Sequence, residues 1–81
     1  MTHLGKLPYS DERLASIMEI HPSELKCSPR RDEIKDIVRE YNLTLDAGRA
    51  VNRLSHIANL YACGEYWVEA IKRLILYIKL G

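Results

Sequence analysis

Residues 47–80 read AGRAVNRLSHIANLYACGEYWVEAIKRLILYIKL, and this stretch decides the fold. Its apolar residues recur at helical spacing in two runs, which Cys63, Gly64 and Glu65 separate. Gly64 marks the end of a helix, because glycine adopts the left-handed backbone of a C-terminal cap without strain. A turn this short makes consecutive helices lie antiparallel. The stretch therefore predicts a helical hairpin at the centre of the structure, with Trp67 as its central large side chain.

Start and stop signals upstream of the hairpin mark two further helices. Ser10 can cap the first, and Pro22 ends it at about residue 20. Ser28 opens the second, because Pro29 follows it and proline is favoured at the first helical position. Together with the hairpin, these signals predict about four helices.

The size and composition of the chain fit one compact domain. It has 81 residues, 47% of them hydrophobic. Its 12 Lys and Arg nearly balance its 11 Asp and Glu, and the formal charge of +1 argues against non-specific nucleic-acid binding. We therefore expect a single all-α domain over residues 1–81, a small helical bundle in which residues 1–9 form a flexible N-terminal segment.

Nothing in the sequence predicts export or a membrane span. Residues 1–9 lack the basic region and the apolar run of a signal peptide. The longest apolar-rich stretch, residues 66–80, contains charged residues and is shorter than the ~20 apolar residues that a span needs. Cys27 and Cys63 allow one disulfide at most, and reduced thiols are the simpler interpretation. We expect a cytoplasmic protein that does not contact a membrane.

The residues that usually carry catalysis form no recognisable constellation. His3, His21 and His56 are scattered, with no cysteine or carboxylate at a spacing that dictates a metal site. There is no glycine-rich phosphate loop, no G-x-S-x-G elbow and no H-E-x-x-H motif. We therefore expect no catalytic residues, no metal and no cofactor, and a protein that is not an enzyme.

One acidic pair keeps an enzymatic alternative open. Glu33 and Asp36 form an E-x-x-D pair on adjacent turns, the spacing that all-α nucleotide pyrophosphohydrolases use for magnesium. Those enzymes need a second acidic pair on a facing helix, for which Glu65 and Glu69 are poor substitutes. The pair supports the hypothesis of a small nucleotide-binding protein or a magnesium-dependent nucleotide hydrolase.

A second alternative is a DNA-binding regulator. Residues 13–27, RLASIMEIHPSELKC, resemble the core of a helix-turn-helix motif. They depart from it at Glu19, where the motif usually has glycine, and at Pro29, which cuts the second helix short. The residues available for nucleic acid or another anion are Lys26, Arg30 and Arg31.

The polar side of the first hairpin helix has two interpretations. It is either a face that recognises a ligand or the solvated side of an amphipathic helix. The residues on it are Arg49, Asn52, Arg53, His56 and Asn59.

Small size and the lack of a catalytic set favour a protein that works by binding another protein. A chain of this length hides only roughly 60% of its unfolded surface, so it would gain stability from a partner, including a second copy of itself. Leu76 lies on the otherwise polar side of the last helix, where a monomer has no use for it. We expect a homo-oligomer or a hetero-complex. The residues predicted to bind the partner are Tyr66, Lys72, Arg73, Leu76 and Leu80.

Two segments of the hairpin carry a family resemblance. GRAVNRL at residues 48–54 and VEAIKRLILYI at residues 68–78 are similar to a family of small bacteriophage proteins of unassigned function, sometimes attached to nucleotide kinases. The family pattern reads G-N-A-I-K-Y-L, then D-L-K-K-A-x-x-Y-L. Here Asn52-Arg53 replaces its Lys-Tyr pair, and its His-Tyr opening is missing. The resemblance implies a viral accessory protein that acts in the cytoplasm of a bacterial host. We hypothesise in addition that it binds and modulates a larger host protein.

Overall fold

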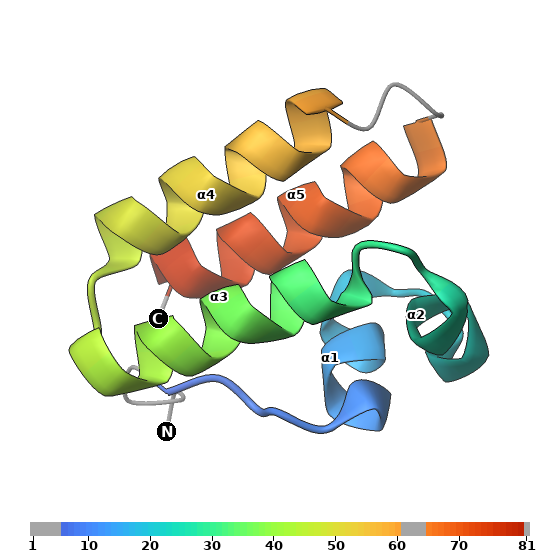
Figure 1. Cartoon of the computed structure of the whole chain (residues 1–81), viewed down its shortest axis with the longest axis horizontal. Helices are drawn as coiled ribbons and strands as arrows, with labels where there is room; N and C mark the ends of the chain where they lie inside the picture. The colour runs from blue at the N-terminus through green and yellow to red at the C-terminus, as the bar shows by residue number, and fades with distance from the viewer. Residues whose placement is uncertain (1–5, 61–64, 81) are drawn as a thin grey trace.

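The computed structural model of the protein describes residues 6–60 and 65–80. In these ranges it contains five α-helices and no strand, which confirms the all-α prediction (Figure 1). The helices are α1 (Asp11–Met18), α2 (Pro22–Cys27), α3 (Arg31–Thr44), α4 (Ala47–Leu60) and α5 (Glu65–Leu80).

Helices α4 and α5 form the predicted antiparallel hairpin (Figure 1). Leu54 of α4 and Ile71 and Leu74 of α5 are fully buried between them and the rest of the bundle. Helix α1 packs on α5, and α3 packs on α4, so the hairpin is the centre of the core. Residues 61–64, with Cys63 and Gly64 of the predicted turn, lie outside the described residues.

Trp67 is not the central side chain of this hairpin. It packs against the core but is only half-buried, and its ring meets that of Tyr66 edge-on, with the centroids 6.2 Å apart. Trp67 stands in the first turn of α5, so its large side chain lies at one end of the hairpin. The prediction was wrong because helical spacing identifies the buried face but not the position along the helix where the core is deepest.

The segment before α3 contains an extra helix. Ser10 caps α1 as predicted, with Oγ accepting from the backbone N–H of Arg13 at 3.3 Å. After a short turn, α2 begins with His21 as its cap, whose Nδ1 accepts from the N–H of Ser23 at 3.2 Å. The fold therefore has one helix more than predicted, because six residues are too short to show an amphipathic period.

Helix α3 begins at Arg31 and not at Pro29. Ser28 Oγ accepts from the backbone N–H of Arg30 at 3.1 Å, so it supports the turn before the helix. At the far end α3 stops at Leu45, which has a left-handed backbone with φ of 58°. Asp46 then caps α4, its Oδ1 accepting from the N–H of Arg49 at 3.1 Å.

Residues 6–10, here called the N-terminal strap, pack against α3. Leu7 is only 4% exposed and belongs to the core. Its backbone N–H donates to Asn42 Oδ1 at 2.7 Å, and its carbonyl accepts from Asn42 Nδ2 at 3.0 Å. Leu7, within the segment 1–9 that the sequence predicted to be flexible, is thus buried and hydrogen-bonded to α3; residues 1–5 lie outside the described part of the chain.

Candidate functional site

Three of the five predicted partner-binding residues share the outer face of α5. Lys72, Leu76 and Leu80 follow one another at four-residue spacing, which places them on one side of a helix. Leu76 is 55% and Leu80 is 80% exposed, whereas Ala70, Ile71 and Leu74 on the opposite side are fully buried. We call these three residues (Lys72, Leu76 and Leu80) the outer face of α5.

The other two predicted partner-binding residues are engaged within the chain. The Tyr66 hydroxyl donates to the Glu24 carboxylate of α2, and this bond lowers the pKa of Glu24 and raises that of Tyr66. Arg73 donates from Nη1 to the backbone carbonyl of Met18 at 3.1 Å, and its Nε lies 3.4 Å from Glu19 Oε1. Tyr66 and Arg73 therefore hold α1 and α2 against α5, although both remain partly exposed.

The three predicted anion-binding residues do not point to a common site. Lys26 is exposed on α2. Arg30 forms an ion pair with Glu33 at 2.8 Å. Arg31 turns to Asp11, with Nη2 2.9 Å from Oδ2. Both guanidinium groups already have carboxylate partners, so an anion at the start of α3 would have to displace them.

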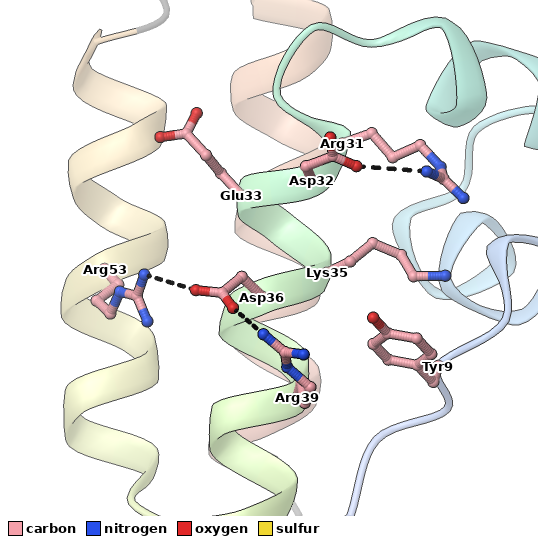
Figure 2. A pocket seen from close by; sticks show the side chains of 8 residues that line it. All are labelled: Tyr9, Arg31, Asp32, Glu33, Lys35, Asp36, Arg39 and Arg53. Carbon is pink, nitrogen blue, oxygen red and sulfur yellow. Dashed lines mark hydrogen bonds and ion pairs between the residues drawn. The ribbon is translucent and has the colours of Figure 1, made fainter.

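A groove of about 560 Å³ on the surface of α3 brings seven charged side chains together (Figure 2). We call it the charged groove. Asp36 lies between two guanidinium groups, 2.7 Å from Arg39 Nη2 and 3.5 Å from Arg53 Nη2. The hydrogen bond from Arg39 is the main cause of the lowered pKa of Asp36. The groove is lined by Tyr9, Arg31, Asp32, Glu33, Lys35, Asp36, Arg39 and Arg53.

The charged groove contains the acidic pair of the magnesium hypothesis. Glu33 and Asp36 both lie on α3, but the side chain that reaches Asp36 from the facing helix α4 is Arg53 (Figure 2). No group of three or more metal-ligating side chains occurs in residues 6–60 and 65–80. A magnesium ion at Asp36 would compete with two guanidinium groups.

Sequence reasoning missed a buried ionic cluster at the edge of the groove. Asp11 is 8% exposed, and it contacts Arg31 at 2.9 Å and Lys35 Nζ at 3.2 Å. The hydrogen bond from Arg31 lowers the pKa of Asp11, against the opposing effect of burial and with a further contribution from Lys35. Lys35 Nζ also lies 4.1 Å from the ring centroid of Tyr9. The four-residue spacing of Arg31 and Lys35 indicated that the two cations share one side of a helix, but nothing in the sequence identified Asp11 as their partner.

The polar side of α4 is partly a clamp between helices. Glu40 of α3 binds Arg49 Nε at 2.9 Å and Arg53 Nη1 at 2.5 Å, and these bonds lower the pKa of Glu40. Two of the five residues on this side therefore hold α3 against α4. The other three, Asn52, His56 and Asn59, are exposed.

Comparison of the chain with protein-family models, curated proteins and solved structures finds no match. The resemblance of residues 48–78 to small bacteriophage proteins stays a prediction. Among the described helices, none has both the length and the apolar character to cross a membrane.

Proposed function

We propose that the protein is a non-enzymatic interaction protein that binds another protein through the outer face of α5. The supporting observation is the exposure of Leu76 and Leu80 on a helix whose other face supplies the centre of the core. Fully burying a leucine side chain contributes about 1.5–3 kcal/mol, so covering both would give a partner a substantial apolar anchor. Lys72, beside them, would add a charge at the edge of the contact.

The resemblance to bacteriophage proteins suggests the setting of this interaction. Under that hypothesis the protein acts in a bacterial cytoplasm, where it binds a larger host protein and modulates or inhibits it. A second copy of the chain is the other partner that the same face could bind, since a self-complementary patch gives a symmetric dimer.

The test compares two leucine-to-aspartate variants. Leu76→Asp introduces a charge on the outer face of α5, whereas Leu43→Asp makes the same change at a leucine that is 81% exposed near the end of α3. Sedimentation velocity measures self-association, and affinity capture from nuclease-treated bacterial lysate measures binding to a host protein. Association that Leu76→Asp abolishes and Leu43→Asp retains would support the proposal. Equal binding by both variants, with unchanged helicity, would contradict it.

A DNA-binding regulator is a second candidate because of one observation at Glu19. This residue has φ of 60°, so the turn between α1 and α2 has the left-handed backbone that glycine usually supplies in a helix-turn-helix. Against it, α2 has six residues and presents Glu24 beside Lys26 on its exposed side. A mobility-shift assay with duplex DNA at low salt tests this candidate, which requires binding that weakens in Lys26→Glu and falls steeply with salt.

A further inference from the structure

A second groove, of about 450 Å³, separates the N-terminal strap from α1 and α5. We call it the strap groove. Its apolar lining comes from Leu7 and Pro8 of the strap, Ile17 of α1 and Tyr77 of α5. Pro8, Ile17 and Tyr77 are half-buried, so part of each remains accessible to a ligand. Lys6 and Arg13 line the same groove, and no carboxylate of the described residues does.

The two cations in the strap groove differ from most others in the protein. Eight of the twelve Lys and Arg side chains form ion pairs with carboxylates of the described residues. Lys6 and Arg13 form none with the described residues, and both are exposed. The strap groove is thus an apolar-lined site with two positive charges that no carboxylate of the described residues neutralises. Such charge favours a ligand that supplies carboxylates.

The walls of the strap groove are fixed before any ligand binds. Asn42 holds Leu7 through both backbone groups, which sets the position of the strap next to Lys6. The cap of Ser10 on Arg13 N–H fixes the start of α1 on the other side. A pre-organised groove loses little conformational entropy when it binds.

We propose that the strap groove binds an acidic peptide segment with an apolar side chain, supplied by a partner protein. Carboxylates of the segment pair with Lys6 and Arg13, and its apolar side chain packs on Ile17 and Tyr77. Nucleic acid fits less well, because two cations next to apolar side chains offer few phosphate contacts. Tyr77 lies one helical turn before Leu80, so a partner on the outer face of α5 can extend into the groove. The inference rests on the proposed function, whose partner it describes.

The test selects peptides without assuming their sequence. A library of random 12-residue peptides is selected on the full chain, and the enriched peptides are synthesised and titrated by fluorescence anisotropy. We expect them to carry Asp or Glu beside a leucine or an aromatic residue. Enriched peptides without acidic residues, or no enrichment at all, would overturn the proposal.

Charge-matched variants locate the peptide site. Lys6→Glu with Arg13→Glu should weaken peptide binding by about tenfold or more, because each substitution replaces an attraction with a repulsion. The control, Lys26→Glu with Lys79→Glu, makes the same change in net charge outside the groove, at two lysines that form no ion pair with the described residues. Equal losses in both variants would show a non-specific charge effect and refute the assignment.

Two further arms separate this proposal from its alternatives. Leu76→Asp should keep peptide affinity within about twofold, because Leu76 does not line the strap groove. The experiment therefore tests the strap groove separately from the outer face of α5. A labelled DNA duplex tested on the same variants should not bind at the groove. The peptide proposal would be overturned if the duplex binds and only the double variant Lys6→Glu, Arg13→Glu abolishes that binding. The groove would then be a nucleic-acid site.

Discussion

The side-chain amide of Asn42 hydrogen-bonds both backbone groups of Leu7, accepting from its N–H at 2.7 Å and donating to its carbonyl at 3.0 Å. The two residues are 35 positions apart in the chain. One amide side chain thus gives an extended backbone the donor and the acceptor that a neighbouring strand would supply. The pair fixes the strap on α3 and, with it, one wall of the strap groove.

Replacing Asn42 with alanine should therefore destabilise the protein. Both bonds are part-buried, and we expect Asn42→Ala to lower the free energy of unfolding by about 1–3 kcal/mol. Urea denaturation followed by circular dichroism measures the loss. Asn52→Ala, on the exposed side of α4, carries the same gain in helix propensity without a lost bond. Equal stability of the two variants would mean that the two hydrogen bonds to Leu7 contribute nothing to stability.

The Asp11 cluster predicts a pH-dependent stability. The pKa of Asp11 is lower in the folded protein than its ordinary value, so its ionised form stabilises the fold above the unfolded pKa of about 3.9. This contribution is lost as the pH falls through the lower folded pKa. Asp11→Asn should cost on the order of 2 kcal/mol at pH 7, because it removes the carboxylate that binds Lys35 and leaves Arg31 with only the exposed Asp32. The difference from the wild type should shrink below about pH 4.

Asp32→Asn is the matched control when the stability of Asp11→Asn is compared with that of the wild type at different pH values. Asp32 also contacts Arg31, at 3.4 Å, but its side chain is 95% exposed. Exposed ion pairs contribute little, so this variant should unfold like the wild type at every pH. A pH-independent deficit in Asp11→Asn would show that Asp11 acts through packing and not through its charge.

Helical spacing predicted the hairpin and the outer face of α5, because both follow from a repeat within one segment. Leu76 was expected on the polar side, and it is exposed. The partners of Tyr66 and Arg73 could not be predicted, since Glu24 and the carbonyl of Met18 come close only after α1 and α2 have packed. The function of the outer face stays a proposal, because exposure does not identify what covers it.

The strap and the Asp11 cluster show the limit of reading a sequence locally. Leu7 is a single apolar residue beside a proline and gives no periodic signal. Asp11 looks like a favourable acidic residue in the first turn of a helix, yet it is buried against two cations of α3. Both contacts join residues 20 or more positions apart and depend on polar groups, which carry no period in the sequence.

The revised position of Trp67 changes the expected effect of its removal. Leu74 is fully buried where α5 meets α1 and α4, so Leu74→Ala should cost about 2–5 kcal/mol. Trp67→Ala should cost less, because a half-buried ring at the end of the hairpin leaves a smaller cavity. Thermal unfolding of the two variants measures the order of their stabilities. A larger loss of stability for Trp67→Ala would show that Trp67 is the central side chain of the hairpin after all.

At the end of α3, glycine should give a more stable protein than alanine in place of Leu45, and a less stable one in place of Leu43. Leu45 has φ of 58°, a conformation that costs an ordinary residue about 1–2 kcal/mol and glycine nothing. Glycine loses about 0.5–1 kcal/mol more backbone entropy than alanine on folding. Leu45→Gly should therefore be more stable than Leu45→Ala by about 0.5–1 kcal/mol, since both variants lose the leucine atoms beyond Cβ but only alanine keeps the Cβ that causes the strain.

Leu43 supplies the control, because it is two residues away, 81% exposed and inside the helix. There the helical backbone favours alanine, so Leu43→Gly should be less stable than Leu43→Ala by up to about 1 kcal/mol. Urea denaturation of the four variants gives both differences. The opposite signs follow from the backbone angle alone, because the side chains removed are identical. If alanine is the better residue at both positions, the left-handed turn at Leu45 is not the conformation that ends α3.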